Sequence, residues 1–159
     1  MKRNYLISIG IVLGVLLLDQ SSKLYIDTVL PLHHSIPIIE DFIHITYVRN
    51  TGAAFGLFAS HVGGLRFFFI TISIVAILVM LFLLRNLKDD QVLLVSSLSL
   101  IIAGAMGNLI DRIRLGEVID FIDLHWYSYH WPAFNVADSA ITVGGGFLAI
   151  NIVFRKEAA

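Results

Sequence analysis

The chain has 159 residues, of which 57% are hydrophobic and only 14% are charged, with a net charge of −1. Soluble domains carry roughly 25% charged residues, so this composition indicates a membrane protein with a single domain's length. The small net charge argues against a nucleic-acid-binding protein, which needs a clustered basic surface. The sequence contains no cysteine, which excludes disulfides, a thiolate nucleophile and a cysteine-ligated metal.

Residues 5–29 predict a first membrane helix with a polar insertion. Lys2 and Arg3 precede an apolar run, which is also how a secretory signal peptide begins, but no small-x-small cleavage pattern follows it. In the insertion, Asp19 and Lys23 stand four residues apart and therefore share one helical face. Two interpretations of this pair stay open: a snorkelling pair near the helix end, or support for a polar site that faces the helix bundle.

Residues 30–65 are mixed in character. Pro31 and Pro37 interrupt any helix. Residues 43–48 show partial alternation of apolar and polar side chains, and residues 50–52 (Asn-Thr-Gly) form a turn signal. The segment therefore predicts a small β-sheet that lies on the membrane surface.

Histidine is concentrated in this same segment. Four of the six histidines of the chain occur here: His33, His34, His44 and His61. No His-Glu-x-x-His motif joins them, so surface histidines are favoured over a metal site. We predict neither a metal nor a cofactor.

Two further spans are predicted at residues 66–85 and 91–110, which contain uncharged runs of eighteen and nineteen residues. Each run approaches the ~20 residues that cross the hydrocarbon core of a membrane. A short polar turn joins them, so they should pack antiparallel. Ala103, Gly104 and Gly107 provide small side chains of the kind that let membrane helices approach closely.

A last apolar run at residues 136–155 predicts a fourth span, which places both termini on one side of the membrane. That side carries six basic residues in short segments: Lys2, Arg3, Arg85, Lys88, Arg155 and Lys156. The other side carries four in two longer loops: Arg49, Arg66, Arg112 and Arg114. Cytoplasmic loops are enriched in Lys and Arg, so we expect cytoplasmic termini and extracytoplasmic segments at residues 30–65 and 111–135.

The predicted fold is an all-α membrane protein in which residues 1–159 form a single integral membrane domain. It has four transmembrane helices with a small extracytoplasmic β-sheet and cap.

Residues 104–139 hold five of the twelve acids of this apolar chain. These acids are Asp111, Glu117, Asp120, Asp123 and Asp138. Counting at about 1.5 Å per helical residue places Asp111 at the outer boundary of the third span. Asp138 falls in the first outer turn of the fourth span, and Asp120 falls in the connecting loop at a comparable depth. Three carboxylates can therefore gather in one plane.

Asp138 has two interpretations. An acid in the first turn of a helix complements the helix dipole, and Asn135 is a natural N-cap. The alternative depends on Asp120, which apolar residues flank on both sides. Apolar surroundings and a second carboxylate both raise the pKa of a carboxyl group. Two such carboxyls share one proton, so that one activates water while the other polarises a peptide carbonyl, as in an aspartic protease.

Other possibilities stay open at this point. Arg112, beside Asp111, is either the partner of a local ion pair or a contact for lipid headgroups. The acids also suit two other functions: a small ion or proton carrier, or a scaffold with structural acids. A carrier needs acids distributed through the depth of the membrane, and the inner halves of these spans have none.

Five motifs give a more specific indication. They are DQSSK (19–23), RNTGAAFG (49–56), GNLIDR (107–112), VIDF (118–121) and FNVADS (134–139). In order and spacing they resemble the motifs of bacterial lipoprotein signal peptidase, or signal peptidase II. The resemblance covers nearly the whole chain, but residues 124–131 match no motif.

The resemblance implies an intramembrane aspartic endopeptidase of the bacterial cytoplasmic (inner) membrane, with its active site at the outer face. It would remove the signal peptide of diacylglyceryl-modified prolipoproteins, just before the lipidated cysteine, with Asp120 and Asp138 as the catalytic dyad. Five further residues would line the site: Asn50, Gly52, Asn108, Arg112 and Asn135. Three would support it: Asp19, Lys23 and Asp111. The implied partners are these substrates, membrane lipids and the cyclic peptide inhibitor globomycin, and no nucleic acid. We also expect residues 42–58 and the loop after Arg112 to cover the site.

Overall fold

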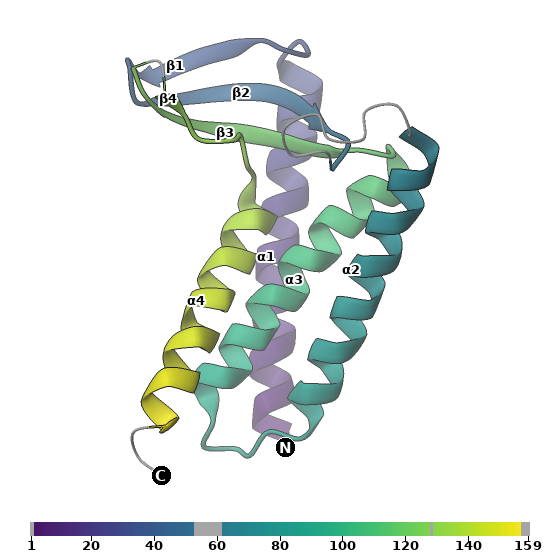
Figure 1. Ribbon diagram of the computed structural model, residues 1–159, viewed down its shortest axis with the longest axis vertical. Helices are drawn as coiled ribbons and strands as arrows, with labels where there is room; N and C mark the ends of the chain where they lie inside the picture. Colours follow the sequence, from purple (N-terminus) through teal and green to yellow (C-terminus); the bar gives the residue numbers. More distant parts are fainter. Residues whose placement is uncertain (1, 53–61, 128, 157–159) are drawn as a thin grey trace.

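The computed structural model describes residues 2–52, 62–127 and 129–156 and shows four long helices with one small sheet at one end of the bundle (Figure 1). The helices are α1 (Lys2–Val29), α2 (Val62–Arg85), α3 (Val92–Arg114) and α4 (Val136–Lys156). The strands are β1 (Ser35–Ile39), β2 (Ile43–Asn50), β3 (Val118–Trp126) and β4 (Tyr129–His130). Each helix is long and apolar enough to cross a membrane. This architecture confirms the predicted fold class.

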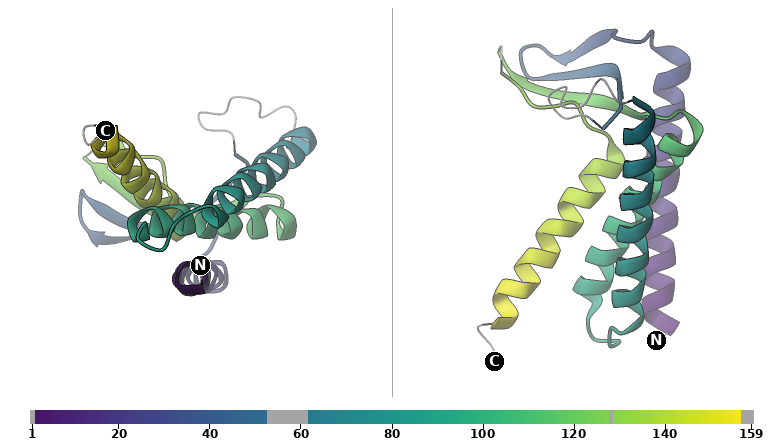
Figure 2. Two further views of the ribbon diagram at one scale, coloured as in Figure 1. Left: turned by 90° about the horizontal axis from the view of Figure 1, so that it is seen from below. Right: turned by 45° about the vertical axis from the view of Figure 1, so that its right-hand side comes forward.

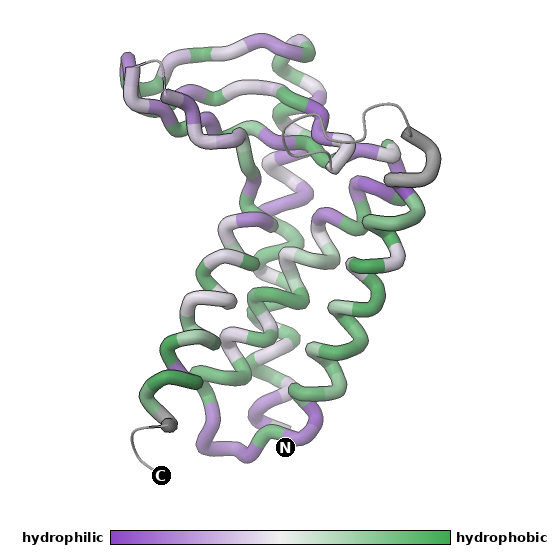
Figure 3. Tube along the Cα trace, viewed as in Figure 1, coloured by the Kyte–Doolittle hydropathy of each residue, from purple (hydrophilic) through white to green (hydrophobic). Residues whose placement is uncertain are grey.

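Helix α3 lies at the centre of the bundle. Seen along the bundle, α2 and α4 point away from each other with α3 between them (Figure 2). Half of the apolar window of α3 is buried, compared with 11–17% in the other helices. The middle of the bundle is hydrophobic and both of its ends are more polar (Figure 3). Exposed apolar side chains over this length suit a hydrocarbon surrounding.

Glycines set the close approach of α3 and α4. A Cβ atom on Gly104 would lie 2.2 Å from the carbonyl oxygen of Ala137, and one on Gly144 would lie 2.7 Å from that of Ser97. Both positions leave no room for a side chain, which confirms the packing role predicted for Gly104. The crossing brings the start of α4 against the outer half of α3.

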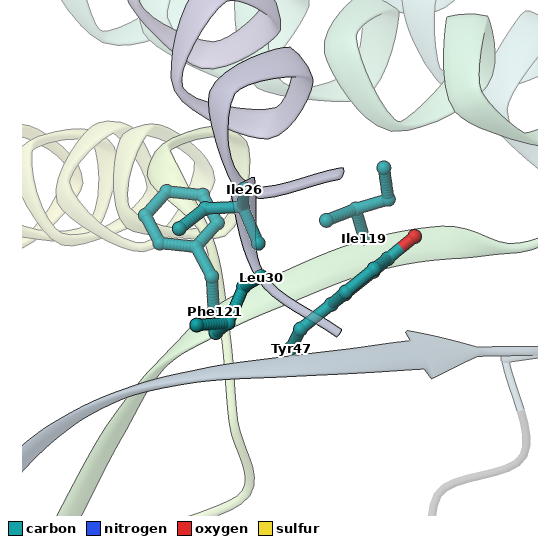
Figure 4. Packing of buried hydrophobic residues seen from close by; sticks show 5 residues of the cluster. All are labelled: Ile26, Leu30, Tyr47, Ile119 and Phe121. Carbon is teal, nitrogen blue, oxygen red and sulfur yellow. The ribbon is translucent and has the colours of Figure 1, made fainter. Parts of the chain in front are cut away.

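The four strands form one antiparallel sheet in the order β1-β2-β3-β4. An apolar cluster joins the sheet to the end of α1, as Figure 4 shows. Its buried members are Ile26, Leu30, Tyr47, Ile119 and Phe121. Their packing holds β3, which carries Asp120, above the helices.

Two boundaries differ from the sequence prediction. Helix α3 continues to Arg114, so Asp111 and Arg112 are helical and do not begin a loop. Residues 118–126 form β3, whereas the prediction placed Asp120 in a connecting loop. The strand pairs with β2, about seventy residues earlier in the sequence; Val48, for example, pairs with Asp120. Local periodicity does not reveal such a distant partner.

Candidate active site

Asp120 and Asp138, which we call the carboxylate pair, converge on one residue, Asn135. Asp120 lies on β3 and is 2% exposed, and Asp138 lies in the first turn of α4. The Asn135 amide Nδ2 donates a hydrogen bond to Asp120 Oδ1 at 2.8 Å. The backbone N–H of Asn135 donates to Asp138 Oδ2 at 3.2 Å. The fold therefore brings together two acids that lie eighteen positions apart in the sequence.

The capping interpretation of Asp138 is correct but incomplete. Asn135 Oδ1 accepts the backbone N–H of Asp138 at 2.9 Å, and Asp138 Oδ2 accepts the backbone N–H of Asn135. This reciprocal pair satisfies two free N–H groups at the start of α4. The other oxygen, Asp138 Oδ1, accepts a hydrogen bond from Asn108 Nδ2 at 2.7 Å and so faces α3. One oxygen caps the helix while the other takes part in the site.

The surroundings of Asp120 favour its protonated form. Burial raises the pKa of Asp120 to about 6, and the charge of Asp138 acts in the same direction. The amides of Asn50, which donates to Asp120 Oδ2 at 2.9 Å, and Asn135 oppose this rise in pKa. Asn50 Oδ1 also accepts the N–H of Gly52 at 2.8 Å, in a turn where Gly52 has φ +92°. A glycine adopts that conformation without strain.

A buried ammonium group lies next to the carboxylate pair. Lys23 is 2% exposed, and its Nζ contacts Asp19 Oδ2 at 2.9 Å, Asp111 Oδ2 at 2.8 Å and Asn108 Oδ1 at 3.0 Å. Three acceptors satisfy the three N–H donors of a lysine. The snorkelling interpretation of Asp19 and Lys23 is therefore wrong, because both side chains are buried inside the bundle.

The ion pairs of Lys23 with Asp19 and Asp111 form a network that also holds the backbone next to each member of the carboxylate pair. Asp19 Oδ1 accepts the N–H of Ala137 at 2.9 Å, one residue before Asp138. Asp111 Oδ2 accepts the N–H of Ile119 at 3.3 Å. A Cβ atom on residue 107 would lie 2.5 Å from Asp19 Oδ2, so glycine there lets the carboxylate reach α3.

One further member of this network, Gln20, was not predicted from the sequence. Its Nε2 lies 3.1 Å from Asp19 Oδ2, 3.1 Å from Asp111 Oδ1 and 3.2 Å from the carbonyl oxygen of Gly107. Gln20 stands inside the first of the five motifs, DQSSK, and a polar side chain in an apolar span usually faces the bundle interior. That signal was available in the sequence.

Arg112 does not form the local ion pair with Asp111, whose carboxylate binds Lys23. Its guanidinium lies over the ring of Phe69, 5.1 Å from the ring centroid. The buried Nε of Arg112 has no hydrogen-bond partner in the part of the chain that the structure describes. The charge of Arg112 attracts the carboxylate pair. The residue therefore places a cation within electrostatic reach of both acids.

An apolar groove with a volume of about 450 Å³ lies beside Asp138. Its lining residues are Leu124, Trp131, Phe134, Asp138, Ser139, Thr142 and Val143. A mainly apolar groove with one carboxylate at its wall suits an extended apolar ligand that carries a polar group. Residues 42–58 were predicted to cover the site. Of these residues, Ile43–Asn50 forms strand β2, and residues 53–58 lie outside the described residues.

The chain was compared with known proteins. The family model described as signal peptidase (SPase) II matches residues 11–154. The lipoprotein signal peptidase of Geobacter sulfurreducens is 53% identical over 157 residues, which cover 99% of this chain and 97% of that protein. The lipoprotein signal peptidase of Pseudomonas putida is 43% identical and covers 91% of this chain and 85% of its own length.

Solved structures agree with these sequence matches. A bacterial membrane enzyme determined by the in meso method at 2.3 Å resolution superposes with a TM-score of 0.84 at 35% identity. The match covers 94% of this chain and 88% of that one. Four membrane-length helices, the sheet at one end and matches along nearly the whole chain lead to one conclusion. The chain belongs to the signal peptidase II family, multi-pass peptidases of the bacterial inner membrane.

Proposed function

We propose that this protein is an aspartic endopeptidase that removes signal peptides from diacylglyceryl-modified prolipoproteins and cuts just before the lipidated cysteine. The names of its relatives, lipoprotein signal peptidases, support this substrate class. The structural observation that carries the proposal is the convergence of Asp120 and Asp138 on Asn135, next to an apolar groove.

In the proposed mechanism the carboxylate pair shares one proton. Below a pH of about 6 Asp120 holds it, since burial raises the pKa of Asp120 to about 6. Asp138 is the proposed base: Asn108 Nδ2 donates a hydrogen bond to its Oδ1, and the start of a helix attracts a carboxylate. Asp138 takes a proton from water as the water oxygen attacks the scissile carbonyl carbon, and Asp120 gives its proton to the carbonyl oxygen. Proton transfer from Asp138 to the amide nitrogen then lets the C–N bond break, while Asp120 recovers a proton from the diol.

The other site residues have positioning roles in this proposal. Asn50, Asn108 and Asn135 donate hydrogen bonds that orient the two carboxylates. Gly52 permits the turn that aims Asn50, and Arg112 contributes a positive charge near the reacting groups. The network of Lys23, Asp19 and Asp111 fixes the backbone one residue before each member of the carboxylate pair.

The location of the site suits a substrate that is already anchored in lipid. The carboxylate pair lies at the end of the bundle that carries the sheet, whereas α1 begins and α4 ends at the other end (Figure 1). With cytoplasmic termini, which the basic residues favour, the site faces the outer side of the membrane. The acyl chains of the substrate would stay in hydrocarbon along the groove, surrounded by membrane lipids. Globomycin would occupy the same place.

The test uses purified protein and one prolipoprotein in two forms. The protein should cleave the diacylglyceryl-modified form and leave the unmodified form uncut, since only the first places its scissile bond at the membrane boundary. Equal cleavage of the two forms would contradict the substrate proposal. Turnover of neither form, with transport of ions across vesicles, would support the carrier function instead.

A further inference from the structure

A second cluster of chemically reactive side chains lies on strands β2 and β3, at positions that belong to none of the five motifs. The register of the sheet places His44 on β2 directly opposite Asp123 on β3. His125 follows two residues after Asp123, and side chains two apart on a strand share a face. Asp120, three residues before Asp123, points to the opposite face of the strand. The cluster is therefore separate from the carboxylate pair.

The distances within this cluster suit a metal ion. One candidate ligand atom from each of His44, Asp123 and His125 lies within 4.8 Å of the others. A tetrahedral zinc ion with nitrogen and oxygen ligands at about 2.0–2.1 Å holds neighbouring ligand atoms about 3.4 Å apart. A spacing of up to 4.8 Å exceeds this value, so the side chains must move closer together to bind an ion. The rings of His44 and His125 meet edge to face with their centroids 4.3 Å apart.

The hydrogen bonding of His125 points to a ligand. Its side chain is only 4% exposed, and its Nδ1 has no hydrogen-bond partner among the residues that the structure describes. The carboxylate oxygen Oδ1 of Asp123 lies 3.9 Å from this nitrogen, beyond hydrogen-bond range. Buried polar atoms in proteins nearly always have a partner. A cation between His125 and Asp123 would be that partner.

Neighbouring side chains orient the other two candidate ligands, His44 and Asp123. Ser35 Oγ lies 3.3 Å from His44 Nδ1, so Nε2 is the nitrogen of His44 that would bind the metal. His130 Nδ1 lies 3.0 Å from Asp123 Oδ1, and its ring stacks on His125 at a centroid distance of 4.5 Å. Metal ligands in proteins are commonly held by such outer hydrogen bonds, which fix the tautomer and the direction of the ligand.

We propose that His44, Asp123 and His125 bind one late transition-metal ion of the Zn²⁺ type, with His130 as the residue that positions Asp123. Two imidazoles and one carboxylate suit Zn²⁺, whereas Ca²⁺ and Mg²⁺ prefer oxygen ligands. The ion cross-links β2 to β3 on the sheet face opposite Asp120. It braces the strand that carries the active-site residue and takes no part in peptide cleavage.

The test measures zinc binding by the full chain in detergent, free of any polyhistidine tag and first stripped with a chelator. Equilibrium dialysis against ZnCl₂, followed by metal analysis, should find one ion per chain. His44→Ala and Asp123→Asn should each weaken binding by more than about tenfold, and His130→Ala by roughly 10- to 100-fold. His34→Ala, an exposed histidine of the same sheet region, is the control and should bind as the wild type does.

A second measurement separates loss of the ligand from loss of the fold. Zinc should raise the melting temperature of the stripped wild type and of His34→Ala, because an ion that binds only the folded chain stabilises it. It should leave the melting temperature of His44→Ala unchanged, while that variant melts cooperatively without zinc. The proposal is overturned if the wild type retains no zinc. It is equally overturned if His44→Ala and Asp123→Asn bind zinc as tightly as His34→Ala does.

Discussion

The side-chain amide of Asn135 joins three elements of the fold. Its Nδ2 contacts Asp120 Oδ1 on β3 and Asn108 Oδ1 on α3, while its Oδ1 caps α4 at the N–H of Asp138. The side chain is fully buried, at 0% exposure. Because this one residue contacts the sheet and both helices, their packing fixes the position of Asp120 relative to Asp138.

The ionisation of Asp120 sets the first prediction at this scale. The mechanism needs Asp120 protonated, and its pKa is raised to about 6, so kcat/KM should fall as the pH increases through about 6. Asn50 stabilises the charged form, because its amide donates to Asp120 Oδ2. Asn50→Ala removes this donor, raises the pKa of Asp120 further and should move the alkaline limb to higher pH. The pH profile of kcat/KM measures this directly. An alkaline limb that stays in place or moves to lower pH would show that Asp120 does not supply the proton that the reaction uses.

The buried ammonium group of Lys23 gives a prediction about stability. Lys23→Met leaves the carboxylates of Asp19 and Asp111 without their cation in a buried place, which costs about 3–5 kcal/mol. Unfolding in a graded detergent–denaturant mixture measures the loss. Lys88→Met, at an exposed position in the turn after α2, is the control and should change stability little. A loss for Lys23→Met as small as that of the control would mean that the network does not hold the site together.

At the scale of elements, the crossing of α3 and α4 determines whether Asp138 reaches Asn108. Gly104→Ala places a Cβ atom 2.2 Å from the carbonyl oxygen of Ala137, which must push the start of α4 outward. Overpacking of this kind costs about 1–3 kcal/mol, and activity should fall with it because the carboxylate pair separates. Thermal unfolding and cleavage rate, measured on the same preparation, check both effects.

Gly145→Ala is the matched control for this glycine, since a Cβ atom on residue 145 meets nothing within 4 Å. Alanine is the better helix former by about 1 kcal/mol, so the control should be as stable as the wild type or slightly more so. Equal behaviour of the two variants would show that close contact between α3 and α4 is not needed.

The elements differ in how far the sequence could predict them. The four helices follow from uncharged apolar runs, because lipid imposes a length and a composition on each span. Strand β3 and the extension of α3 to Arg114 were missed, since pairing with β2 and contact with Lys23 depend on residues far away in the chain. The same reason explains why the cluster of His44, Asp123 and His125 was not expected.

The candidate site could be predicted where a motif or a local rule applied. Asp120 and Asp138 stand out because acids are rare in an apolar chain, and the capping role of Asn135 follows from its place before a helix. The burial of Lys23 could not be decided, because a polar pair near a helix end is equally compatible with snorkelling. The contact between Lys23 and Asp111 on α3 shows that the side chain of Lys23 lies inside the bundle.

At the scale of the whole molecule, the fold places a polar site between a lipid-facing bundle and a sheet. Helix α3 contacts every other helix, so it links the network around Lys23 to the start of α4. The sheet rests on the end of α1 through the apolar cluster (Figure 4). Its strand β3 carries Asp120 to within hydrogen-bond distance of Asn135, just before α4. Neither part alone contains both carboxylates.

The measurement that tests this account most directly is cleavage of a diacylglyceryl-modified prolipoprotein by purified Asp120→Asn and Asp138→Asn proteins. Each change keeps the size of the side chain, and asparagine at position 138 still accepts the capping hydrogen bond. Each should lower the cleavage rate by more than about 100-fold, since a general acid or base contributes roughly 10²–10⁴. Asp90→Asn, at an exposed position in the turn before α3, should cleave normally. Near-normal cleavage by either of the first two variants, folded and inserted in the membrane, would contradict the shared-proton mechanism.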